Sequence, residues 1–513
     1  MPSLKEITEK LKSPTPADIE LIDRAYNFAQ KAHQGHTRYS GEPYFIHVFE
    51  TAKILADFGM CSQTIAAGLL HDTIEDTDTE ADEVRAEFGD EIFFLVEGVT
   101  KLGKVRYRGL DRHNESLRKL FVATAQDIRV IIIRLADRLH NIRTLEHVPE
   151  KKQARIAKET LDIYAPIAYR LGIQRIHREL EDSAFPYVYP EEYKEIKEIF
   201  DKERSEREEN LKKFHKSLVK ELVKQNVKLI KTDYRIKGLY SLYLKYLRKE
   251  KDINKIYDIL AIRVIVPTVS DCYNVLGIIH GNWRPMPKRI KDYISFQKPN
   301  GYRSLHTTVF TGNGAITEVQ IKTEEMHNEA EYGIASHISY KKGGSIEDNR
   351  NWITRLMPFS WVKANDDCSN GKTVQTDNKV PHWLKELLEN DTMVNDTSEF
   401  VDSLKGDLFE HRIFVFTPDG DVIDLPKDAS PIDFAYAVHS DIGDKTFGAK
   451  VNNKMVSLDK PLQNGDTVEI QTKSSSKPTE KWLRYAKTSL AQRKIRSAIS
   501  KDKQDSKMYQ ENR

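Results

Sequence analysis

The stretch Leu69–Thr77, LLHDTIEDT, constrains the fold of this chain more than any other, because it sets four ionisable side chains directly behind an apolar run. The run, IAAGLL, is typical of a buried helix. On a continuous helix, residues four apart share a face, which predicts that His71 lies beside Glu75 and Asp72 beside Asp76. Unpaired buried charge costs several kcal/mol. These groups therefore need partners, and we expect a metal ion to be one of them.

Length and composition bound the remaining alternatives. A chain of 513 residues is too long for one ordinary core and predicts three or four domains at roughly 150 residues each. Charged residues make up 31% of the chain, but the net charge is only +2, so basic regions must be judged locally. Cys61, Cys272 and Cys368 form no CxxC pair, which favours a reducing compartment. With no run of membrane-spanning length and no signal-peptide core, we expect a cytoplasmic protein without a membrane partner.

Polar residues interrupt the helical patterns of the first region. Thr15 followed by Pro16 predicts a helix start, and His47 lies among apolar residues further on. The stretch DIRVIIIRLADRLHNIRTLEHV is either a buried strand leading into a helix or one long helix, and it carries Asp137. Asn141 and Thr144 follow Asp137 on the same helical face. Each of these residues taken singly is more often a structural group than a ligand, but the combination favours a site.

The order His47, His71–Asp72, then a distant Asp137 resembles the ligand order of the HD phosphohydrolase superfamily. Two imidazoles and two carboxylates, with positions left for water and phosphate, suit a divalent ion such as Mn²⁺ better than a closed structural Zn²⁺ site. Such an ion lowers the pKa of bound water and neutralises phosphate charge. A metal-dependent hydrolase is therefore expected here.

The segments RYSGEPYFIH, HDTIEDT and RLADRLHNIRTL resemble the hydrolase half of the RelA/SpoT family of alarmone synthetase/hydrolases. The resemblance implies that (p)ppGpp is the substrate and that its 3′-pyrophosphate is removed to give GDP or GTP. Glu75 and Asp76 match the acidic pair that assists the attacking water, while Tyr39 stands where many members carry Lys. The positions that match nucleotide-holding residues are Arg38, Asn141 and Thr144. The full ligand set implies that hydrolysis is intact, since synthetase-only members have lost it.

The second region combines a charged helical segment, 201–231, with two strand patterns. We expect the segment to be a solvated connecting helix rather than a nucleic-acid-binding arm. The predicted strand DILAIRVIV has Asp258 at its entrance, and the predicted strand AITEVQIKT turns Glu318, Gln320 and Lys322 to one side. The basic, tyrosine-rich stretch YRIKGLYSLYLKYLRKEK alone is also compatible with an RNA-binding patch. Two carboxylates on neighbouring strands, surrounded by bases, favour a Mg²⁺-nucleotide site on a nucleotidyltransferase-like sheet.

This second region resembles the synthetase domain of the same family. The resemblance implies transfer of pyrophosphate from ATP to the 3′-hydroxyl of GDP or GTP. Asp258 and Glu318 match the acidic pair that handles Mg²⁺, Glu318 also being placed to take the 3′-hydroxyl proton, and Tyr302 matches the residue that stacks on guanine. The segment Arg289–Asp292 fits the RxKD variant of bifunctional members. The other nucleotide-binding residues that we expect are Arg235, Lys237, Lys245, Lys291, Lys298, Asn300 and His306.

The third region predicts a β-grasp domain that resembles the TGS domain. HRIFVFTPDGDVIDLP predicts a hairpin, Ser430–Pro431 start a helix that runs to Gly443, and TVEIQT supplies a last strand. His439 matches the residue that touches the 3′ end of uncharged tRNA in long members; a small docking domain is an equally open alternative. The basic tail, with Trp482 and Tyr485, fits either RNA contact or intramolecular docking. It ends where long family members continue into further C-terminal modules.

The sequence thus predicts a multidomain chain with three folded domains. They are an all-α HD-type hydrolase domain at 1–195, an α/β nucleotidyltransferase-like synthetase domain at 196–345, a linker with short helices at 346–408, a β-grasp (TGS) domain at 409–473 and a basic helical tail at 474–513. The expected function is bifunctional alarmone turnover in the stringent response, with Mn²⁺ for hydrolysis and Mg²⁺ for synthesis. Two alternatives stay open: a net hydrolase with a weak synthetase, and a sensor that binds tRNA or the ribosome.

Overall fold

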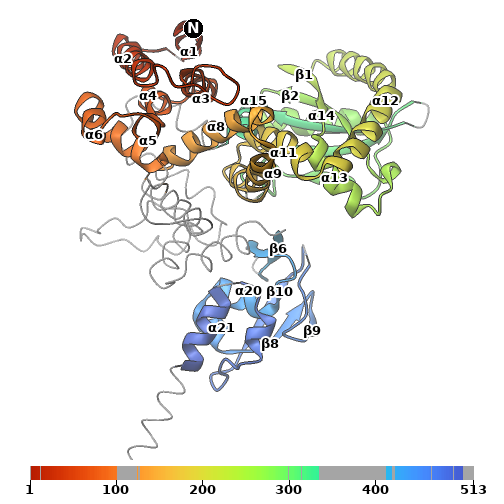
Figure 1. Ribbon diagram of the computed structural model, residues 1–513. Coiled ribbons are helices and arrows are strands. Elements are labelled where there is room, and N and C mark those ends of the chain that lie inside the picture. Colours follow the sequence, from red (N-terminus) through yellow and green to blue (C-terminus); the bar gives the residue numbers. More distant parts are fainter. Residues whose placement is uncertain are drawn as a thin grey trace, which may run out of the picture. The chain divides into compact units, whose positions relative to one another are not determined.

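The computed structural model describes residues 2–11, 13–100, 124, 127–298, 300–312, 315–333, 412–418, 422–463, 465–488 and 490–500. The described residues up to 333 form one compact part and those from 412 onward form another (Figure 1). Each part is described by itself. The predicted linker at 346–408 and Cys368 lie outside the described residues. Within the described ranges, no helix is both long and apolar enough to cross a membrane.

The first part begins with a helical domain, as predicted. Its helices are α1 (Lys5–Thr8), α2 (Pro16–Ala32), α3 (Phe45–Asp57), α4 (Ser62–Leu70), α5 (Thr73–Asp76), α6 (Ala81–Val99), α8 (Arg129–Arg143), α9 (Glu150–Glu159), the π-helical turn η2 (Thr160–Tyr164), α10 (Ala165–Arg170) and α11 (Gln174–Val188). Thr15 caps α2 by accepting a hydrogen bond from the Asp18 backbone N–H, as the Thr-Pro signal predicts. Asp137 lies on α8, which is one helix and not a strand leading into a helix.

The prediction of one continuous helix through LLHDTIEDT is wrong. Helix α4 ends at Leu70 and α5 begins at Thr73, so His71 and Asp72 lie at the junction. Two side chains take up the carbonyls at the end of α4: the His71 Nδ1–H donates to Gly68 O at 2.8 Å, and the Thr73 hydroxyl donates to Leu70 O at 2.5 Å. Side chains that satisfy the last carbonyls of a helix stabilise its end. The junction places both ionisable groups at a bend.

A mixed five-stranded sheet forms the second domain of this part. Its strands are β1 (Lys231–Ile236), β2 (Leu260–Val266), β3 (Lys291–Asp292), β4 (Leu305–Phe310) and β5 (Ile316–Thr323), in the order β1-β2-β5-β4-β3. Only β2 and β5 pair in parallel, with Ala261 opposite Glu318. This register brings Glu318 to the end of β2 that Asp258 precedes. The accompanying helices are α13 (Leu239–Arg248), α14 (Val269–Asn282) and α15 (Glu324–Tyr332).

Residues 201–224 of the charged segment belong to α12 (Pro190–Lys224), which is not merely a solvated connecting helix. Its apolar residues Phe214, Leu218 and Leu222 lie in the core beneath the sheet, together with Ile262 and Val264 of β2. Figure 1 shows α12 beside β2 and α14. The predicted helix is confirmed, but the prediction that it is solvated is wrong, because apolar residues spaced four apart form one buried stripe even where most of the helix is charged.

Helix α11 connects the helical domain to the sheet domain. Its Asp182 accepts a hydrogen bond from the Tyr240 backbone N–H at 3.0 Å, next to the start of α13. Its Arg178 pairs with Glu331 of α15 at 2.7 Å. These contacts bring the end of α10 and the start of α11 to one side of the sheet.

The second part has the strands and helices expected of a small β-grasp-like domain. They are β6 (Arg412–Phe416), β7 (Val422–Pro426), α20 (Pro431–Val438), α21 (Ser440–Asp444), β8 (Thr446–Val451), β9 (Lys454–Val456), β10 (Val468–Thr472) and α22 (Trp482–Tyr485). The predicted helix from Ser430 to Gly443 is in fact two helices, because His439 has extended backbone (φ −164°, ψ 142°). Its imidazole Nδ1 accepts a hydrogen bond from the Asp441 backbone N–H and so caps α21.

The tail segment that follows β10 docks against this domain, which supports the docking alternative over RNA contact. Trp482 is buried with Ile432 and Tyr436 of α20. The fully buried Asp433 uses one carboxylate oxygen to accept a hydrogen bond from the Ser430 backbone N–H. Its other oxygen accepts hydrogen bonds from the Lys487 N–H and from the backbone and hydroxyl of Thr488 at 2.7–2.8 Å. One carboxylate therefore joins α20 to the tail.

We expect Asp433→Asn to release the tail, because an amide presents N–H groups to donors that require acceptors. The free energy of local opening of residues 482–488 should fall by about 2–3 kcal/mol. Hydrogen exchange with mass spectrometry measures this loss of protection. Glu469→Gln removes only an exposed ion pair with Lys450 and serves as the control. Unchanged protection of 482–488 in Asp433→Asn would contradict the role of this carboxylate.

Candidate active sites

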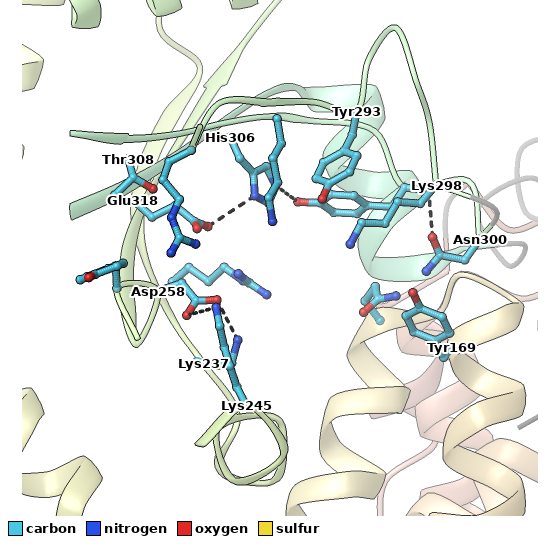
Figure 2. Close-up of a pocket in the computed structure, with 16 residues that line it drawn as sticks. Tyr169, Lys237, Lys245, Asp258, Tyr293, Lys298, Asn300, His306, Thr308 and Glu318 are labelled. Atoms are coloured by element: carbon cyan, nitrogen blue, oxygen red, sulfur yellow. Dashed lines mark hydrogen bonds and ion pairs between the residues drawn. The ribbon is translucent and has the colours of Figure 1, made fainter. Parts of the chain in front are cut away.

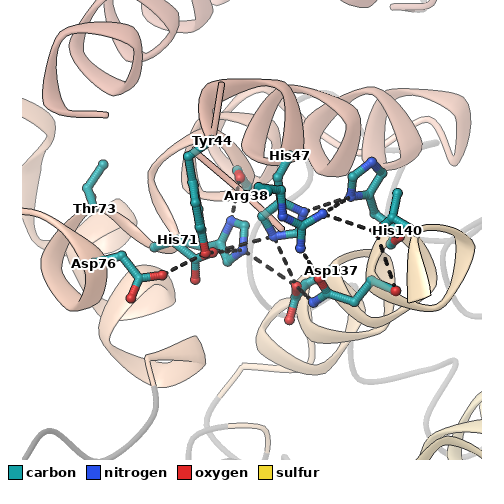
Figure 3. Close-up of polar contacts among 12 residues, drawn as sticks. Arg38, Tyr44, His47, His71, Thr73, Asp76, Asp137 and His140 are labelled. Atoms are coloured by element: carbon teal, nitrogen blue, oxygen red, sulfur yellow. Dashed lines mark hydrogen bonds and ion pairs between the residues drawn. The ribbon is translucent and has the colours of Figure 1, made fainter. Parts of the chain in front are cut away.

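Two imidazoles and two carboxylates converge inside the helical domain (Figure 3). Ring nitrogens of His47 and His71 and an oxygen of Asp137 lie within 4.8 Å of one another. His47 Nε2 is 3.3 Å from Asp137 Oδ1 and 3.4 Å from Asp72 Oδ2, and His71 Nε2 is 3.2 Å from the same Asp72 oxygen. All four side chains are buried. They come from α3, the junction after α4, and α8, so three separate segments build one cluster.

The hydrogen bonding of His71 supports a role as a metal ligand. Its Nδ1–H donates to Gly68 O, which leaves Nε2 as the nitrogen that faces the cluster. This buried Nε2 has no hydrogen-bond partner among the described residues. Metal-binding histidines typically donate their other ring N–H to a carbonyl in this way. The orphaned nitrogen therefore fits a bound cation.

The electrostatics of the cluster also require positive charge. Burial raises the pKa of Asp72 and Asp137, but the neighbouring imidazoles, and Arg134 in the case of Asp137, outweigh it and hold both pKa values well below their usual range. Burial lowers the pKa of His71, yet the two carboxylates raise it to about 10. Two ionised carboxylates buried together attract a cation, either a proton on an imidazole or a metal ion. The donor set of two nitrogens and two oxygens suits a divalent metal ion.

The predicted nucleotide residues lie beside this cluster and contact one another. Arg38 donates to the Thr144 hydroxyl at 3.2 Å and to the Asn141 side-chain oxygen. Asn141 in turn donates to Asp137 Oδ1 at 2.5 Å. Asp76 lies at the exposed edge of the site and Glu75 is half-buried.

Sequence reasoning missed three residues at this site. The Tyr44 hydroxyl lies 2.8 Å from Asp72 Oδ2 and 2.6 Å from Asp76 Oδ2, and burial followed by the charge of Asp72 raises its pKa. Arg134 pairs with Asp137 at 2.7 Å. His140 contacts His47, and burial, with His47 and Arg38 nearby, lowers the pKa of His140 to about 3. Arg134 and His140 stand three residues from Asp137 on α8, and Tyr44 stands three residues before His47, directly before α3. This spacing was the available signal.

A second site opens beside the sheet (Figure 2). Every residue predicted for the synthetase site lines this pocket. The lining residues that the sequence did not single out for binding are Tyr169, Gln174, Tyr257, Arg289, Tyr293 and Thr308. Tyr169 and Gln174 come from the α10–α11 region, far from the sheet in sequence, so no local pattern could predict them.

The two carboxylates of the pocket have different partners. Asp258 pairs with Lys237 at 2.8 Å and with Lys245 at 2.7 Å, and these lysines outweigh burial and hold its pKa below its usual value. Glu318 accepts a hydrogen bond from Gln320 at 2.8 Å and lies 3.4 Å from His306 Nδ1. Burial raises the pKa of Glu318, but His306 and Gln320 lower it to about 2. Both carboxylates are therefore ionised near neutral pH.

Tyr302 stands at the other side of the pocket, after a turn in which Gly301 has positive φ (75°). Its hydroxyl lies 2.9 Å from His306 Nε2. The Lys298 ammonium is 5.3 Å from the centre of its ring and 4.8 Å from the centre of the Tyr293 ring. Burial, together with Lys291 and Arg235, lowers the pKa of Lys298 to about 8. The pocket thus joins aromatic faces to a concentration of positive charge, an arrangement that fits a nucleotide with phosphates.

Comparison with known proteins agrees with this architecture. Residues 25–174 match the HD domain family, residues 234–345 match the region found in RelA/SpoT proteins, and residues 413–472 match the TGS domain. These ranges lie inside the hydrolase, synthetase and TGS domains that the sequence predicts.

Several relatives match nearly the whole chain, and three of them are described here. The chain is 44% identical over 504 residues to guanosine-3′,5′-bis(diphosphate) 3′-pyrophosphohydrolase of Aquifex aeolicus. This match covers 98% of this chain and 68% of the relative. It is 43% identical over 496 residues to a GTP pyrophosphokinase of Myxococcus xanthus, over 96% of this chain and 62% of the relative. It is 40% identical over 503 residues to the bifunctional (p)ppGpp synthase/hydrolase SpoT of Escherichia coli, over 98% of this chain and 68% of the relative.

The chain therefore spans between 62% and 68% of the length of these relatives. Their names describe both hydrolysis and synthesis. With its HD, RelA/SpoT and TGS regions in the same order as the three described domains, the chain belongs to the RelA/SpoT family of alarmone hydrolases and synthetases.

Proposed function

We propose that this chain is a bifunctional enzyme that hydrolyses (p)ppGpp to pyrophosphate and GDP or GTP, and that also makes (p)ppGpp by transfer of pyrophosphate from ATP to GDP or GTP, with release of AMP. The observation that carries the proposal is that one chain holds two separate sets of ionised carboxylates. One set is buried beside two imidazoles, one of which has a ring nitrogen, His71 Nε2, without a hydrogen bond to the described residues. The other lies in a pocket rich in lysine, arginine and tyrosine. The first suits metal-assisted hydrolysis, and the second suits phosphoryl transfer between nucleotides.

In the hydrolytic site, His47, His71, Asp72 and Asp137 would hold Mn²⁺, which would supply Lewis acidity and lower the pKa of a bound water. The acidic pair of Glu75 and Asp76 assists the attacking water. The Tyr44 hydroxyl orients Asp76, since it lies 2.6 Å from that carboxylate. Arg38, Asn141 and Thr144 form a polar wall that binds the nucleotide beside the cluster. The chain thus positions the water, the base and the substrate.

In the synthetic site, Tyr302 stacks on the guanine of the acceptor, and Glu318 accepts the proton of its 3′-hydroxyl. Asp258 would hold Mg²⁺, and Lys237 and Lys245 keep this carboxylate ionised. Phosphoryl transfer depends mainly on in-line positioning and charge neutralisation. The remaining cations, Arg235, Lys291 and Lys298, bind phosphate groups, while His306 and Asn300 hold the Tyr302 loop, which the His306 contact at 2.9 Å supports.

The TGS domain supports a second candidate role as a tRNA or ribosome sensor. Its His439 side chain is 65% exposed, so a partner can reach it. Gel-shift assays with deacylated and aminoacylated tRNA distinguish this role, and binding of neither form would remove it. A comparison of the two catalytic rates in one preparation decides whether the chain is a net hydrolase with a weak synthetase.

Single substitutions should separate the two activities. Asp72→Asn removes a metal ligand and should lower ppGpp hydrolysis with Mn²⁺ by about 100-fold or more, beyond the loss typical of outer-shell changes, while synthesis stays within about twofold. Glu318→Gln removes the proton acceptor and should lower synthesis from ATP and GDP by about 100-fold or more, with hydrolysis unchanged. Nucleotide chromatography measures both rates. If the parent chain turned over nucleotide in neither assay, the proposed function would be wrong.

The binding of GDP should weaken with increasing pH. The pKa of Lys298 is lowered to about 8 in the free pocket, and a bound phosphate favours its charged form. Its contribution is therefore present below pH 8 and is lost as the pH rises through this value. We expect the dissociation constant for GDP to rise about tenfold from pH 7 to pH 9.

Lys298→Arg is the matched control for this pH dependence, because a guanidinium stays protonated throughout the range. The variant should show a clearly flatter profile in a fluorescence titration with a labelled GDP. An identical slope in the parent and the variant would contradict the assignment to Lys298.

A further inference from the structure

His140 lies between the metal ligands and the nucleotide-binding wall, and the mechanism above does not use it. It stands on α8, three residues after Asp137, and is only 8% exposed. Its Nδ1 lies 2.7 Å from Nδ1 of His47 and 3.4 Å from the Arg38 guanidinium (Figure 3). One imidazole nitrogen therefore touches both a proposed metal ligand and a proposed nucleotide residue.

The positions of the protons follow from these contacts. Two ring nitrogens 2.7 Å apart share one hydrogen, so one nitrogen donates and the other accepts. Arg38 has only N–H donors, and one of them points at His140 Nδ1, so this nitrogen is the acceptor. The hydrogen therefore belongs to His47 Nδ1. A neutral imidazole carries one N–H, which leaves a lone pair on His47 Nε2, the atom that faces Asp72 and Asp137.

We propose that His140 is a positioning residue of the metal centre: by accepting the hydrogen bond from His47 Nδ1, it fixes the tautomer and the orientation in which His47 Nε2 binds the ion. The proposal rests on the proposed function, in that the cluster binds a divalent metal. The Nδ1–H of His71 donates to Gly68 O, and this hydrogen bond fixes the same tautomer in His71. A backbone carbonyl therefore serves one imidazole ligand, and a second imidazole serves the other.

Arg38 extends this arrangement to a second ligand. Besides His140, it donates to the Asn141 side-chain oxygen, and Asn141 donates to Asp137 Oδ1. One guanidinium thus holds the outer partners of two ligands, His47 and Asp137. A change at His140 should therefore act on the metal even when no nucleotide is bound.

The test is the Mn²⁺ affinity of the full chain without nucleotide, measured by calorimetry or by the paramagnetic resonance of free Mn²⁺. Loss of an outer-shell partner typically costs about 10–100-fold in metal affinity, and we expect this loss for His140→Leu. In His140→Asn, the amide oxygen replaces Nδ1 as acceptor, and the affinity should stay within about threefold of the parent. His280→Leu is the matched control, since it removes an imidazole bonded to Thr307 in the sheet domain.

The outcomes separate the claims. A parent chain that binds no Mn²⁺ at this cluster would overturn the proposed hydrolytic site itself, and with it the role of His140. If the parent binds Mn²⁺ and His140→Leu binds it equally well, only the role of His140 is wrong. If His140→Leu also loses synthesis, it has misfolded, and His140→Asn decides: an affinity near that of the parent supports the proposal, and a loss of tenfold or more overturns it. A direct nucleotide contact would instead raise the KM for ppGpp and leave Mn²⁺ affinity unchanged.

Discussion

The helical domain depends on one constraint, the buried cluster formed by His47, His71, Asp72 and Asp137. Two ionised carboxylates at this depth are stable only beside positive charge, and the facing nitrogen of His71 forms no hydrogen bond with the described residues. The end of α4 helps to form this cluster. Helix α4 stops where His71 donates to its last turn, and the resulting bend turns Asp72 toward α3 and α8.

The two sites differ in the charge of the side chains that line them. The hydrolytic cluster gathers two buried, ionised carboxylates around two imidazoles, a donor set that suits a divalent cation. The synthetic pocket already contains an excess of lysine and arginine around Asp258 and Glu318, so it attracts anionic nucleotides directly. Tyr169 and Gln174 of the helical domain line the synthetic pocket, and α11 contacts both domains. The antagonistic sites therefore share part of their framework.

The structure brings together most of the residues that the sequence singled out, because they stand in short segments that resemble motifs of the RelA/SpoT family. Asp258 and Glu318 stand at strands, whose residue pattern differs from the helical spacing of the segments around them. His47 and Asp137 are polar residues in apolar helices. The break after Leu70 could not be predicted, since it depends on side chains bonding to carbonyls rather than on propensity. His140 and Tyr44 act through contacts between segments far apart in sequence, and the apolar stripe of α12 was hidden by its many charges.

Anomalous diffraction from crystals soaked in Mn²⁺ tests the central claim most directly, because it locates the ion independently of any activity. The account predicts a single strong peak in the helical domain, within bonding distance of His47 Nε2, His71 Nε2 and one oxygen each of Asp72 and Asp137. It also predicts that His47 Nδ1 stays hydrogen-bonded to His140. A helical domain without a peak at saturating Mn²⁺, or a peak bound by other residues, would contradict it.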